Sequence, residues 1–404
     1  MRDIFTIRRR FGAAVAAFVA AATVGGGAAA LPAEAAPAAL GKVLRENSPT
    51  GIDNSYLVVL KQSARFRAAS PKGTQLAAKY GARVDKAYSS AVNGYAVSVS
   101  AAGARSFAED PSVAFVEKNQ RLSLDATQTD PPWGLDRIDQ AALPLSRSYT
   151  YPDSAGGAAT VYVIDTGVRI THQQIAGRAV YGYDAVDGDN VAADGHGHGT
   201  HVATTIAGTT YGAAKATKIV AVRVLGNDGS GTTSGVIAGV DWVTAHRVRP
   251  AVANMSLGGG ASTALDTAVN NSIASGVTYT VAAGNSNANA SGSSPARVSA
   301  AITVGATTNT DYRASYSNYG SVLDLFAPGS SITAGWYTSD TATATLSGTS
   351  MAAPHVAGAA AVYLTAHPTA GPADVRNALV AGATNGVLHS VGLGSPNRLL
   401  RVVP

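Results

Sequence analysis

Short runs of apolar, largely β-branched residues recur through the second half of the chain and constrain its fold most strongly. They lie at 161–164, 219–224 and 300–304. Apolar residues at nearly every position predict strands that are buried on both faces, which is typical of a parallel sheet. Helix-like stretches at 236–245 and 264–275 alternate with these runs, and another is expected at 372–379. The pattern therefore predicts an α/β fold in three layers, with a mainly parallel central sheet covered by helices on both faces.

Residues 348–355, Gly-Thr-Ser-Met-Ala-Ala-Pro-His, place a hydroxyl group at the start of an apolar helix. We expect Ser350 at the helix N-terminus, where free N–H groups and the helix dipole favour a developing negative charge. We expect Pro354 in the first helical turn, where its missing N–H leaves no bond unmade. A serine in such a place is most often an ordinary helix cap, so its interpretation depends on partners elsewhere in the chain.

The first partner is Asp165, which follows the apolar run 161–164 and begins the triplet Asp-Thr-Gly. A carboxylate at the carboxyl end of a central strand lies where open α/β sheets place their catalytic crevice. Asp-Thr-Gly also occurs in aspartic proteases, which need a second such triplet to form paired carboxylates. The chain has no second Asp-Thr-Gly and no Asp-Ser-Gly, which argues against that class.

The second partner lies in residues 194–201, Asp-Gly-His-Gly-His-Gly-Thr-His, ahead of a helix expected near Val202. The imidazole of His198 could take a proton from a serine if a carboxylate fixed its other ring nitrogen. His196, His198 and His201 could instead bind zinc as a compact cluster. The best-known metallohydrolase pattern of this shape has an acid at the position of Thr200, so the triad is favoured.

Asp165, His198 and Ser350 occur in the order Asp, His, Ser, which is one of the orders known for serine hydrolase triads. Asn285 ends a further apolar run at 281–285, and its amide could donate a hydrogen bond to an oxyanion. An isolated Gly-Asn is usually a turn, but beside these three residues the catalytic interpretation is favoured.

Taken in order, these segments resemble the subtilases, specifically the proteinase K branch and its aqualysin-like members. The matching segments are 133–140, 162–167, 198–201, 256–260, 282–285 and 348–352, spread over nearly all of 126–404. The resemblance implies a subtilisin-like fold and a serine endopeptidase that cuts proteins and peptides through an acyl-enzyme on Ser350. Asp165 would orient the imidazole of His198, which would act as general base and then as general acid. The Asn285 side chain and the Ser350 N–H would hold the oxyanion.

The resemblance also implies which residues hold the substrate. The walls of the pocket for P1, the residue before the cut bond, would be Ser256, Leu257, Gly258, Ala282, Ala283 and Gly284, and Gly229, Ser230 and Gly231 would pair with the substrate backbone. This lining is small and uncharged, so we expect an apolar or aromatic P1 residue rather than Lys or Arg. Pairing through the main chain predicts modest sequence specificity.

Three residues depart from the family pattern. Thr204 stands where the family usually has glycine, His196 where it often has asparagine, and Ser299 where it usually has proline. None of them removes a catalytic atom, so we expect activity. An inactive scaffold that only binds peptides is the non-enzyme alternative.

The chain has no cysteine, so disulfides cannot stabilise it and bound cations are expected instead. Oxygen-bearing side chains cluster in one short stretch: Asp136, Asp139, Gln140, Ser146 and Ser148. They suit calcium, which takes six to eight oxygen ligands. The matching loop binds calcium in the aqualysin-like enzymes that the chain resembles. A solvated polar loop without a cation is the alternative. The resemblance implies a second calcium site made by the Asp324 carboxylate and the carbonyls of Ser299 and Ala301.

The N-terminal 125 residues are expected to be removed from the mature enzyme. Residues 1–35 form a signal peptide, with four arginines before an Ala-rich apolar stretch and a small-residue cleavage site at 33–35. Arg8, Arg9 and Arg10 also resemble a twin-arginine motif, although we expect the general export route. The product would be secreted, and because no other long apolar run occurs, no membrane anchor is expected.

Residues 36–125 are predicted to be a propeptide with a structured core at about 52–121. Strands at 55–60, near Val84, at 95–99 and at 113–116, with helices at 73–80 and 101–109, give a small α+β, ferredoxin-like domain. It resembles the subtilase propeptide, which acts as intramolecular chaperone and inhibitor; a permanent N-terminal domain is the alternative. The peptidase domain would occupy 126–404, although Asp125 would fit an apolar pocket poorly, so cleavage after Leu124 is equally open.

The formal net charge of +5 does not indicate a nucleic-acid or membrane partner. Residues 126–404 carry 14 Lys and Arg against 16 Asp and Glu, so the basic excess belongs to the segment that should be removed. We expect the mature enzyme to be a monomer.

Overall fold

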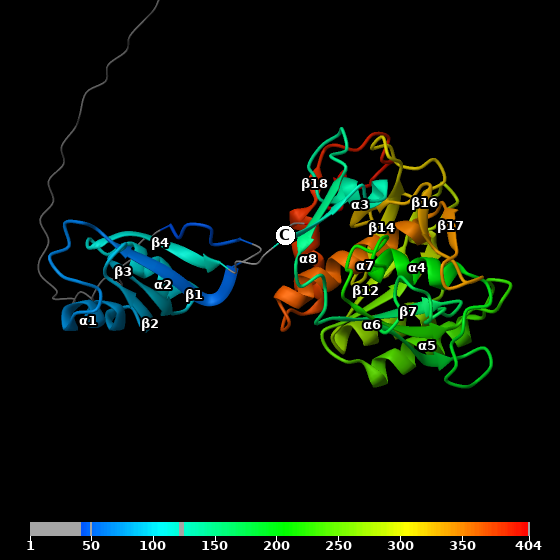
Figure 1. The fold of residues 1–404 in the computed structure, drawn as a ribbon, viewed down its shortest axis with the longest axis horizontal. Coiled ribbons are helices and arrows are strands. Elements are labelled where there is room, and N and C mark those ends of the chain that lie inside the picture. Colours follow the sequence, from blue (N-terminus) through cyan, green and yellow to red (C-terminus); the bar gives the residue numbers. More distant parts are fainter. Residues whose placement is uncertain (1–41, 49–50, 121–124, 403–404) are drawn as a thin grey trace, which may run out of the picture. The chain divides into compact units, whose positions relative to one another are not determined.

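In a computed structural model of the chain, the described residues are 42–48, 51–120 and 125–402. They form two compact units, a smaller one built around 58–116 and a larger one that contains 125–402, and each is described by itself (Figure 1). The predicted signal peptide and the residues just before the predicted cleavage points, 121–124, lie outside the described residues.

The smaller unit has the chain order β1 (Gly51–Leu60), α1 (Pro71–Lys79), β2 (Arg83–Tyr88), β3 (Gly94–Ser98), α2 (Ala101–Ala108) and β4 (Val113–Gln120). Its sheet has the strand order β2-β3-β1-β4, which is the split βαβ arrangement predicted from the sequence. Ser70 and Ser100 cap the two helices by accepting hydrogen bonds from backbone N–H groups. The ring of Phe107 is fully buried against the sheet and stacks on Tyr80 at 4.8 Å.

The larger unit is built on a nine-stranded sheet. In spatial order the strands are β18 (Thr384–Asn385), β19 (Arg398–Leu399), β15 (Leu325–Pro328), β14 (Ile302–Thr307), β12 (Val277–Ala282), β10 (Ala251–Met255), β7 (Thr160–Asp165), β9 (Lys218–Arg223) and β8 (Ala179–Asp184). Every neighbouring pair is parallel except β18 with β19. The predicted mainly parallel sheet is therefore confirmed.

Helices cover both faces of this sheet and make the three layers (Figure 1). Helices α4 (His198–Ala207) and α7 (Thr349–Ala366) pack on one face, and α5 (Thr233–His246) and α6 (Thr263–Ala274) pack on the other. Strand β7 supplies both cores, because its side chains alternate between the faces. Val161 and Val163 join the first core, and Tyr162 and Ile164 join the second.

The remaining elements of the larger unit are β5 (Asp125–Thr129), α3 (Trp133–Ile138), β6 (Ser148–Pro152), β11 (Gly259–Gly260), the 3-10 turn η1 (Ala290–Gly292), β13 (Ser293–Ser294), β16 (Ile332–Gly335), β17 (Thr343–Leu346) and α8 (Pro372–Gly382). Strands β16 and β17 form an antiparallel hairpin whose second strand leads into α7. None of the helices in the described residues is both long and apolar enough to cross a membrane.

Two helices differ from the sequence prediction in ways that affect the site. Helix α4 begins at His198 itself rather than near Val202. Pro354 is the sixth residue of α7, beyond the first turn in which we expected it. Because Pro354 has no N–H, the carbonyl of Ser350 loses its helical partner. The hydroxyl of Ser256 donates to that carbonyl instead, at 2.8 Å.

Candidate active site

Four adjacent parallel strands bring the predicted site residues to one edge of the sheet. Strands β9, β7, β10 and β12 are neighbours in that order. Asp165 ends β7, Ser256 follows β10, and Asn285 follows β12 by three residues. The loop with Gly229, Ser230 and Gly231 lies between β9 and α5. The carboxyl edge of a parallel sheet is the usual place for a catalytic crevice, so the topology accounts for this convergence.

Asp165 and His198 form the central contact of the site. His198 Nδ1 lies 2.7 Å from Asp165 Oδ1, and the carboxylate is fully buried. Gly199 allows this approach, since a Cβ there would lie 2.1 Å from the carbonyl oxygen of Gly167. Thr166 Oγ1 accepts a hydrogen bond from Gly199 N at 2.9 Å and ties the end of β7 to the start of α4.

Asp194 holds the loop before α4, a role that the sequence analysis missed. Its Oδ1 accepts hydrogen bonds from the backbone N–H groups of His196 and Gly197 at 3.0 and 2.7 Å. Its Oδ2 accepts from Thr200 N at 2.9 Å and from Thr200 Oγ1. An aspartate followed by glycine commonly bonds the backbone two residues ahead, and that signal in the sequence could have identified it.

The environment of His198 favours a general base. Burial lowers the pKa of His198. The carboxylate of Asp165 has the opposite effect, because it attracts the imidazolium and accepts its hydrogen bond, and with the charge of Asp194 this effect is the larger. The net pKa of His198 is raised above its ordinary value. Because a carboxylate accepts and cannot donate, Nδ1 carries the proton and the Nε2 lone pair is free in the neutral ring.

Ser350 is the second residue of α7 and is partly exposed. Its Oγ donates to the carbonyl oxygen of Ser256 at 3.0 Å. Among the hydrogen bonds of the described residues none joins Ser350 Oγ to His198, so the hydroxyl has to turn away from the Ser256 carbonyl before it can donate to the imidazole. Catalytic hydrogen bonds of this kind commonly form only when substrate is bound.

Asn285 is held in the orientation that an oxyanion donor requires. Its Oδ1 accepts from Thr349 N at 2.8 Å and from Thr349 Oγ1 at 2.9 Å. A backbone N–H can only donate, so the side-chain oxygen must face Thr349 and Nδ2 must face away from it. Asn318 supports the same loop by accepting from Ser286 N and Ala288 N, each at 3.0 Å. The sequence analysis identified neither Thr349 nor Asn318 as a support.

A groove of about 520 Å³ runs past His198. Six residues predicted to bind substrate line it: Gly229, Ser230, Gly231, Ser256, Leu257 and Gly258. The first three form a loop with φ +77° at Gly229, not an assigned strand. Ala282 and Ala283 are buried, and they and Gly284 are not among the lining residues. Thr349 Oγ1 accepts from Gly284 N at 3.1 Å, which places these residues beside the start of α7.

The zinc alternative is wrong. Within the described ranges no three His, Cys, Asp or Glu side chains converge so that they could hold a metal ion. His198 is bonded to Asp165, and His201 Nε2 donates to the carbonyl of Ile332 at 3.0 Å.

Residues 156–394 match the family described as "Subtilase family". The chain is 53% identical over 371 residues to an "Extracellular serine proteinase" of Thermus sp. (strain Rt41A), with 87% of this chain and 90% of that protein covered. The chain belongs to the subtilase family. It is therefore a serine endopeptidase, and the inactive-scaffold alternative is not retained.

Further comparisons agree with the subtilase assignment. The chain is 47% identical over 363 residues to "Alkaline serine exoprotease A" of Vibrio alginolyticus, covering 86% of this chain and 67% of that one. A solved structure titled "Crystal structure of a cold adapted subtilisin-like serine proteinase" matches with a TM-score of 0.67 at 53% identity, over 68% of this chain and all of that one. Residues 45–125 match "Peptidase inhibitor I9", so the smaller unit of this subtilase is an I9 propeptide domain.

The first predicted calcium site of this subtilase has an arrangement that fits a cation. Ser146 Oγ lies 3.0 Å from Asp136 Oδ1 and 2.9 Å from Ser148 Oγ, and Gln140 Oε1 accepts from Ser146 N at 2.9 Å. Asp139 Oδ1 is buried and has no hydrogen-bond partner. Burial, and then the nearby charge of Asp136, raise the pKa of Asp139 against the opposing effect of a backbone hydrogen bond. A cation would relieve both effects.

The second predicted calcium site does not fit a cation. Asp324 Oδ1 receives the guanidinium of Arg376, with Nε at 2.8 Å, and Oδ2 accepts from Thr303 N at 2.9 Å. Both oxygens of Asp136 in the first site also accept hydrogen bonds, but from neutral N–H and O–H groups. At Asp324 one donor is a positively charged guanidinium, which opposes a cation. The carboxylate that was expected to bind calcium together with the carbonyls of Ser299 and Ala301 is thus already paired with an arginine.

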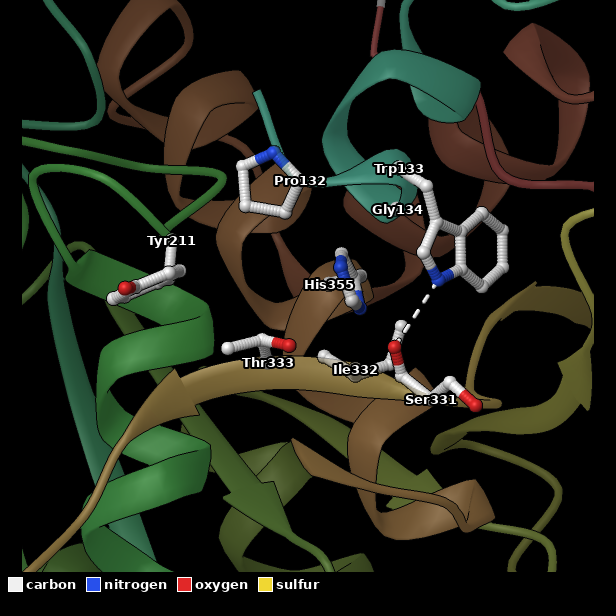
Figure 2. A pocket seen from close by; sticks show the side chains of 8 residues that line it. All are labelled: Pro132, Trp133, Gly134, Tyr211, Ser331, Ile332, Thr333 and His355. Atoms are coloured by element: carbon white, nitrogen blue, oxygen red, sulfur yellow. Dashed lines mark hydrogen bonds between the residues drawn. The ribbon is translucent and has the colours of Figure 1, made fainter. Parts of the chain in front are cut away.

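A second, smaller cavity of about 180 Å³ lies outside the groove (Figure 2). His355 lines it together with Trp133 and Thr333, as Figure 2 shows. His355 Nδ1 donates to the carbonyl of Met351 at 2.8 Å, and burial lowers the pKa of His355 to about 4. No predicted catalytic or substrate-binding residue lines this cavity, so we assign it no part in the reaction.

Proposed function

We propose that this subtilase is a secreted endopeptidase that is made as a self-processing precursor and cleaves proteins after apolar or aromatic residues. Two of its relatives are named extracellular serine proteinase and exoprotease. The predicted signal peptide at 1–35 agrees with export. The observation that carries the proposed mechanism is the 2.7 Å contact between Asp165 and His198 at the edge of the groove.

Ser350 is the proposed nucleophile. Its Oγ rotates from the Ser256 carbonyl, gives its proton to His198 Nε2 and forms a bond to the scissile carbonyl carbon. The imidazolium then gives this proton to the leaving amine as the C–N bond breaks, which leaves an acyl-enzyme. Water repeats the sequence, with its proton moving through His198, and releases the acid and free Ser350. Asp165 keeps the ring in the required tautomer throughout.

Asn285 Nδ2 and the Ser350 N–H are the proposed oxyanion donors. Within the described residues neither group donates a hydrogen bond to a protein acceptor, so both can donate to an oxyanion. The Thr349 contacts at 2.8 and 2.9 Å hold the amide of Asn285 in place. Donors that are fixed before the charge develops lose no reorganisation energy in the transition state. Removing one such donor typically lowers kcat by a factor of about 100 to 1,000.

The composition of the groove supports the proposed P1 preference. Its apolar members are Leu225, Val236, Leu257 and Leu265, and many of the rest are glycine. The acidic residue in the lining, Asp228, is exposed and already accepts from Ser230 Oγ and Ser230 N. A P1 lysine or arginine would therefore enter the pocket without a buried acidic partner.

We also propose that the I9 domain blocks the groove until it is cleaved off near residues 124–125, and that the mature enzyme is a monomer. Calcium is the proposed stabilising cation. Asp136, Asp139, Gln140, Ser146 and Ser148 would hold it. It would supply positive charge to two carboxylates that make no ion pair within the described residues. Arg137 lies between them in sequence but pairs with Asp311 at 2.7 Å.

The proposed function is tested by hydrolysis of peptide amides with Phe, Leu, Lys or Arg at P1. A serine-directed sulfonyl fluoride and a chelator are run in parallel. We expect turnover of the Phe and Leu substrates, rapid loss with the sulfonyl fluoride, and slow loss with chelator only on warming. Equal or better cleavage after Lys and Arg would contradict the P1 proposal, and resistance to the sulfonyl fluoride would contradict the mechanism.

A further inference from the structure

Thr204 lies within α4, where the subtilase pattern usually has glycine, and its side chain is fully buried. Its hydroxyl makes hydrogen bonds in two directions. Oγ1 donates within the helix to the carbonyl of Thr200 at 2.9 Å or of His201 at 3.1 Å. It accepts from Gly335 N at 2.8 Å. A backbone N–H can only donate, so the direction of the bond to Gly335 is fixed.

Gly335 is the last residue of β16, so this bond joins α4 to the β16–β17 hairpin. A second bond joins the same two elements, from His201 Nε2 to the carbonyl of Ile332 at 3.0 Å. The packing between them leaves little room. A Cβ on Gly335 would lie 2.9 Å from Thr204 Cγ2 and 2.7 Å from the ring of His172. The hairpin therefore cannot move against the helix without breaking polar contacts.

Of the two elements that Thr204 joins, one carries the proposed base and the other leads into the helix that carries the nucleophile. Helix α4 begins with His198, the proposed base. The hairpin continues from β17 through residues 347 and 348 into α7, whose second residue is the nucleophile Ser350. Helices α4 and α7 also pack directly on each other in the core. In addition to that packing, the separation of imidazole and hydroxyl depends on how α4 lies against the hairpin.

We propose that Thr204 is a positioning residue that sets the distance between His198 and Ser350 by linking α4 to the β16–β17 hairpin. The inference rests on the proposed roles of His198 and Ser350. Without the hydroxyl, Gly335 N–H is buried with no acceptor, which is costly enough to shift the hairpin or to admit water. A displacement of about 1 Å at the reacting groups can lower the rate about 100-fold.

Thr205 provides a matched control in the same helix. It is equally buried, and its hydroxyl donates to the carbonyl of His201 at 2.9 Å without reaching another element. Replacing Thr205 by valine removes a buried hydroxyl of the same kind but leaves the link between α4 and the hairpin intact.

The test compares the processed forms of Thr204→Val, Thr204→Ser, Thr204→Ala, Thr205→Val and Thr205→Ala. Active sites are counted by titration, and kcat and KM are measured on a Phe-P1 peptide amide. We expect kcat of Thr204→Val and Thr204→Ala to fall about 10- to 100-fold, with KM within about twofold. We expect Thr204→Ser and both Thr205 variants to stay within about threefold of the parent.

Equal kcat values for the Thr204 and Thr205 variants would overturn the inference, as would a Thr204→Ser variant as slow as Thr204→Val. If the valine variants do not fold, the alanine pair decides in the same way. A parent enzyme that turned over but resisted the sulfonyl fluoride would instead overturn the proposed roles of His198 and Ser350, and this inference with them.

Discussion

Ser256 and Ser350 are joined by two reciprocal hydrogen bonds: Ser256 Oγ donates to the Ser350 carbonyl at 2.8 Å, and Ser350 Oγ donates to the Ser256 carbonyl at 3.0 Å. Pro354 makes the first bond possible, because it removes the helical donor that the Ser350 carbonyl would otherwise have. The start of α7 is thereby fixed to the end of β10, the strand next to the one that carries Asp165.

Ser256→Ala should destabilise the mature enzyme, because the Ser350 carbonyl is left without a donor. We expect a loss of about 1–3 kcal/mol. In Ser256→Ala/Pro354→Ala the new N–H of residue 354 can supply the missing bond, so part of the loss should be recovered. Thermal unfolding of sulfonyl-fluoride-inactivated enzyme measures both variants. Strictly additive effects of the two substitutions would contradict the role given to Pro354.

Asp165→Asn should leave the fold intact but lower kcat by about 10⁴, the loss known for the equivalent change in a serine protease triad. The parent should lose activity as pH falls, because protonated His198 cannot act as a base. Its pKa is raised by Asp165, so the midpoint of this acid limb should lie above about 6.5, the ordinary value for histidine. In Asp165→Asn the midpoint should move down. A midpoint unchanged by the substitution would show that the carboxylate does not act on His198.

Two buried histidines should make the fold sensitive to acid. Burial lowers the pKa of His201 and of His355 to about 4. Between that value and about 6.5, the unfolded chain binds more protons than the folded one, so the stability that is present above pH 6.5 is lost as pH falls towards 4. Each histidine should contribute on the order of 3 kcal/mol to this loss.

The variant His355→Gln tests this prediction by unfolding of the inactivated enzyme between pH 7 and 4. The slope of its unfolding free energy against pH should be smaller than that of the parent, by the equivalent of about one bound proton. This holds whatever the stability of the variant is at pH 7. The exposed His389 provides the control, and His389→Gln should keep the dependence of the parent. Identical slopes for all three proteins would be inconsistent with the burial argument.

Calcium should raise the unfolding temperature of the inactivated enzyme in proportion to the logarithm of its concentration, through the site at Asp139. We expect Asp139→Asn to lose most of this response. Asp324→Asn should keep it, because Asp324 is paired with Arg376. Loss of the response in Asp324→Asn, with retention in Asp139→Asn, would reverse the assignment of the two sites.

The sequence predicted the layers, the sheet and the strand that ends in Asp165, because buried parallel strands leave continuous apolar runs. It missed β16 and β17, which are only four residues long each, and β17 has no buried position. It also placed the start of α4 too late, since glycines around His198 do not indicate a helix. Here Asp194 holds the helix start through its side chain, and such a contact depends on the fold.

The candidate site was predictable where single residues follow strands, as at Asp165 and Asn285, and less so where residues act through partners. Asp324 illustrates the limit: Arg376, 52 positions later, occupies the carboxylate that a metal ion would need. Thr204 is a second example of this limit, because only the fold brings its hydroxyl next to Gly335 N, 131 positions away in the chain. No local pattern in the chain encodes either pair.

Mass mapping of the sulfonyl fluoride adduct is the most direct test of the central claim, that His198 activates Ser350. The account predicts a single adduct, on Ser350, in the processed enzyme at pH 8, and almost none in His198→Ala under the same conditions. An adduct on another residue, or labelling of Ser350 at the same rate without His198, would contradict it.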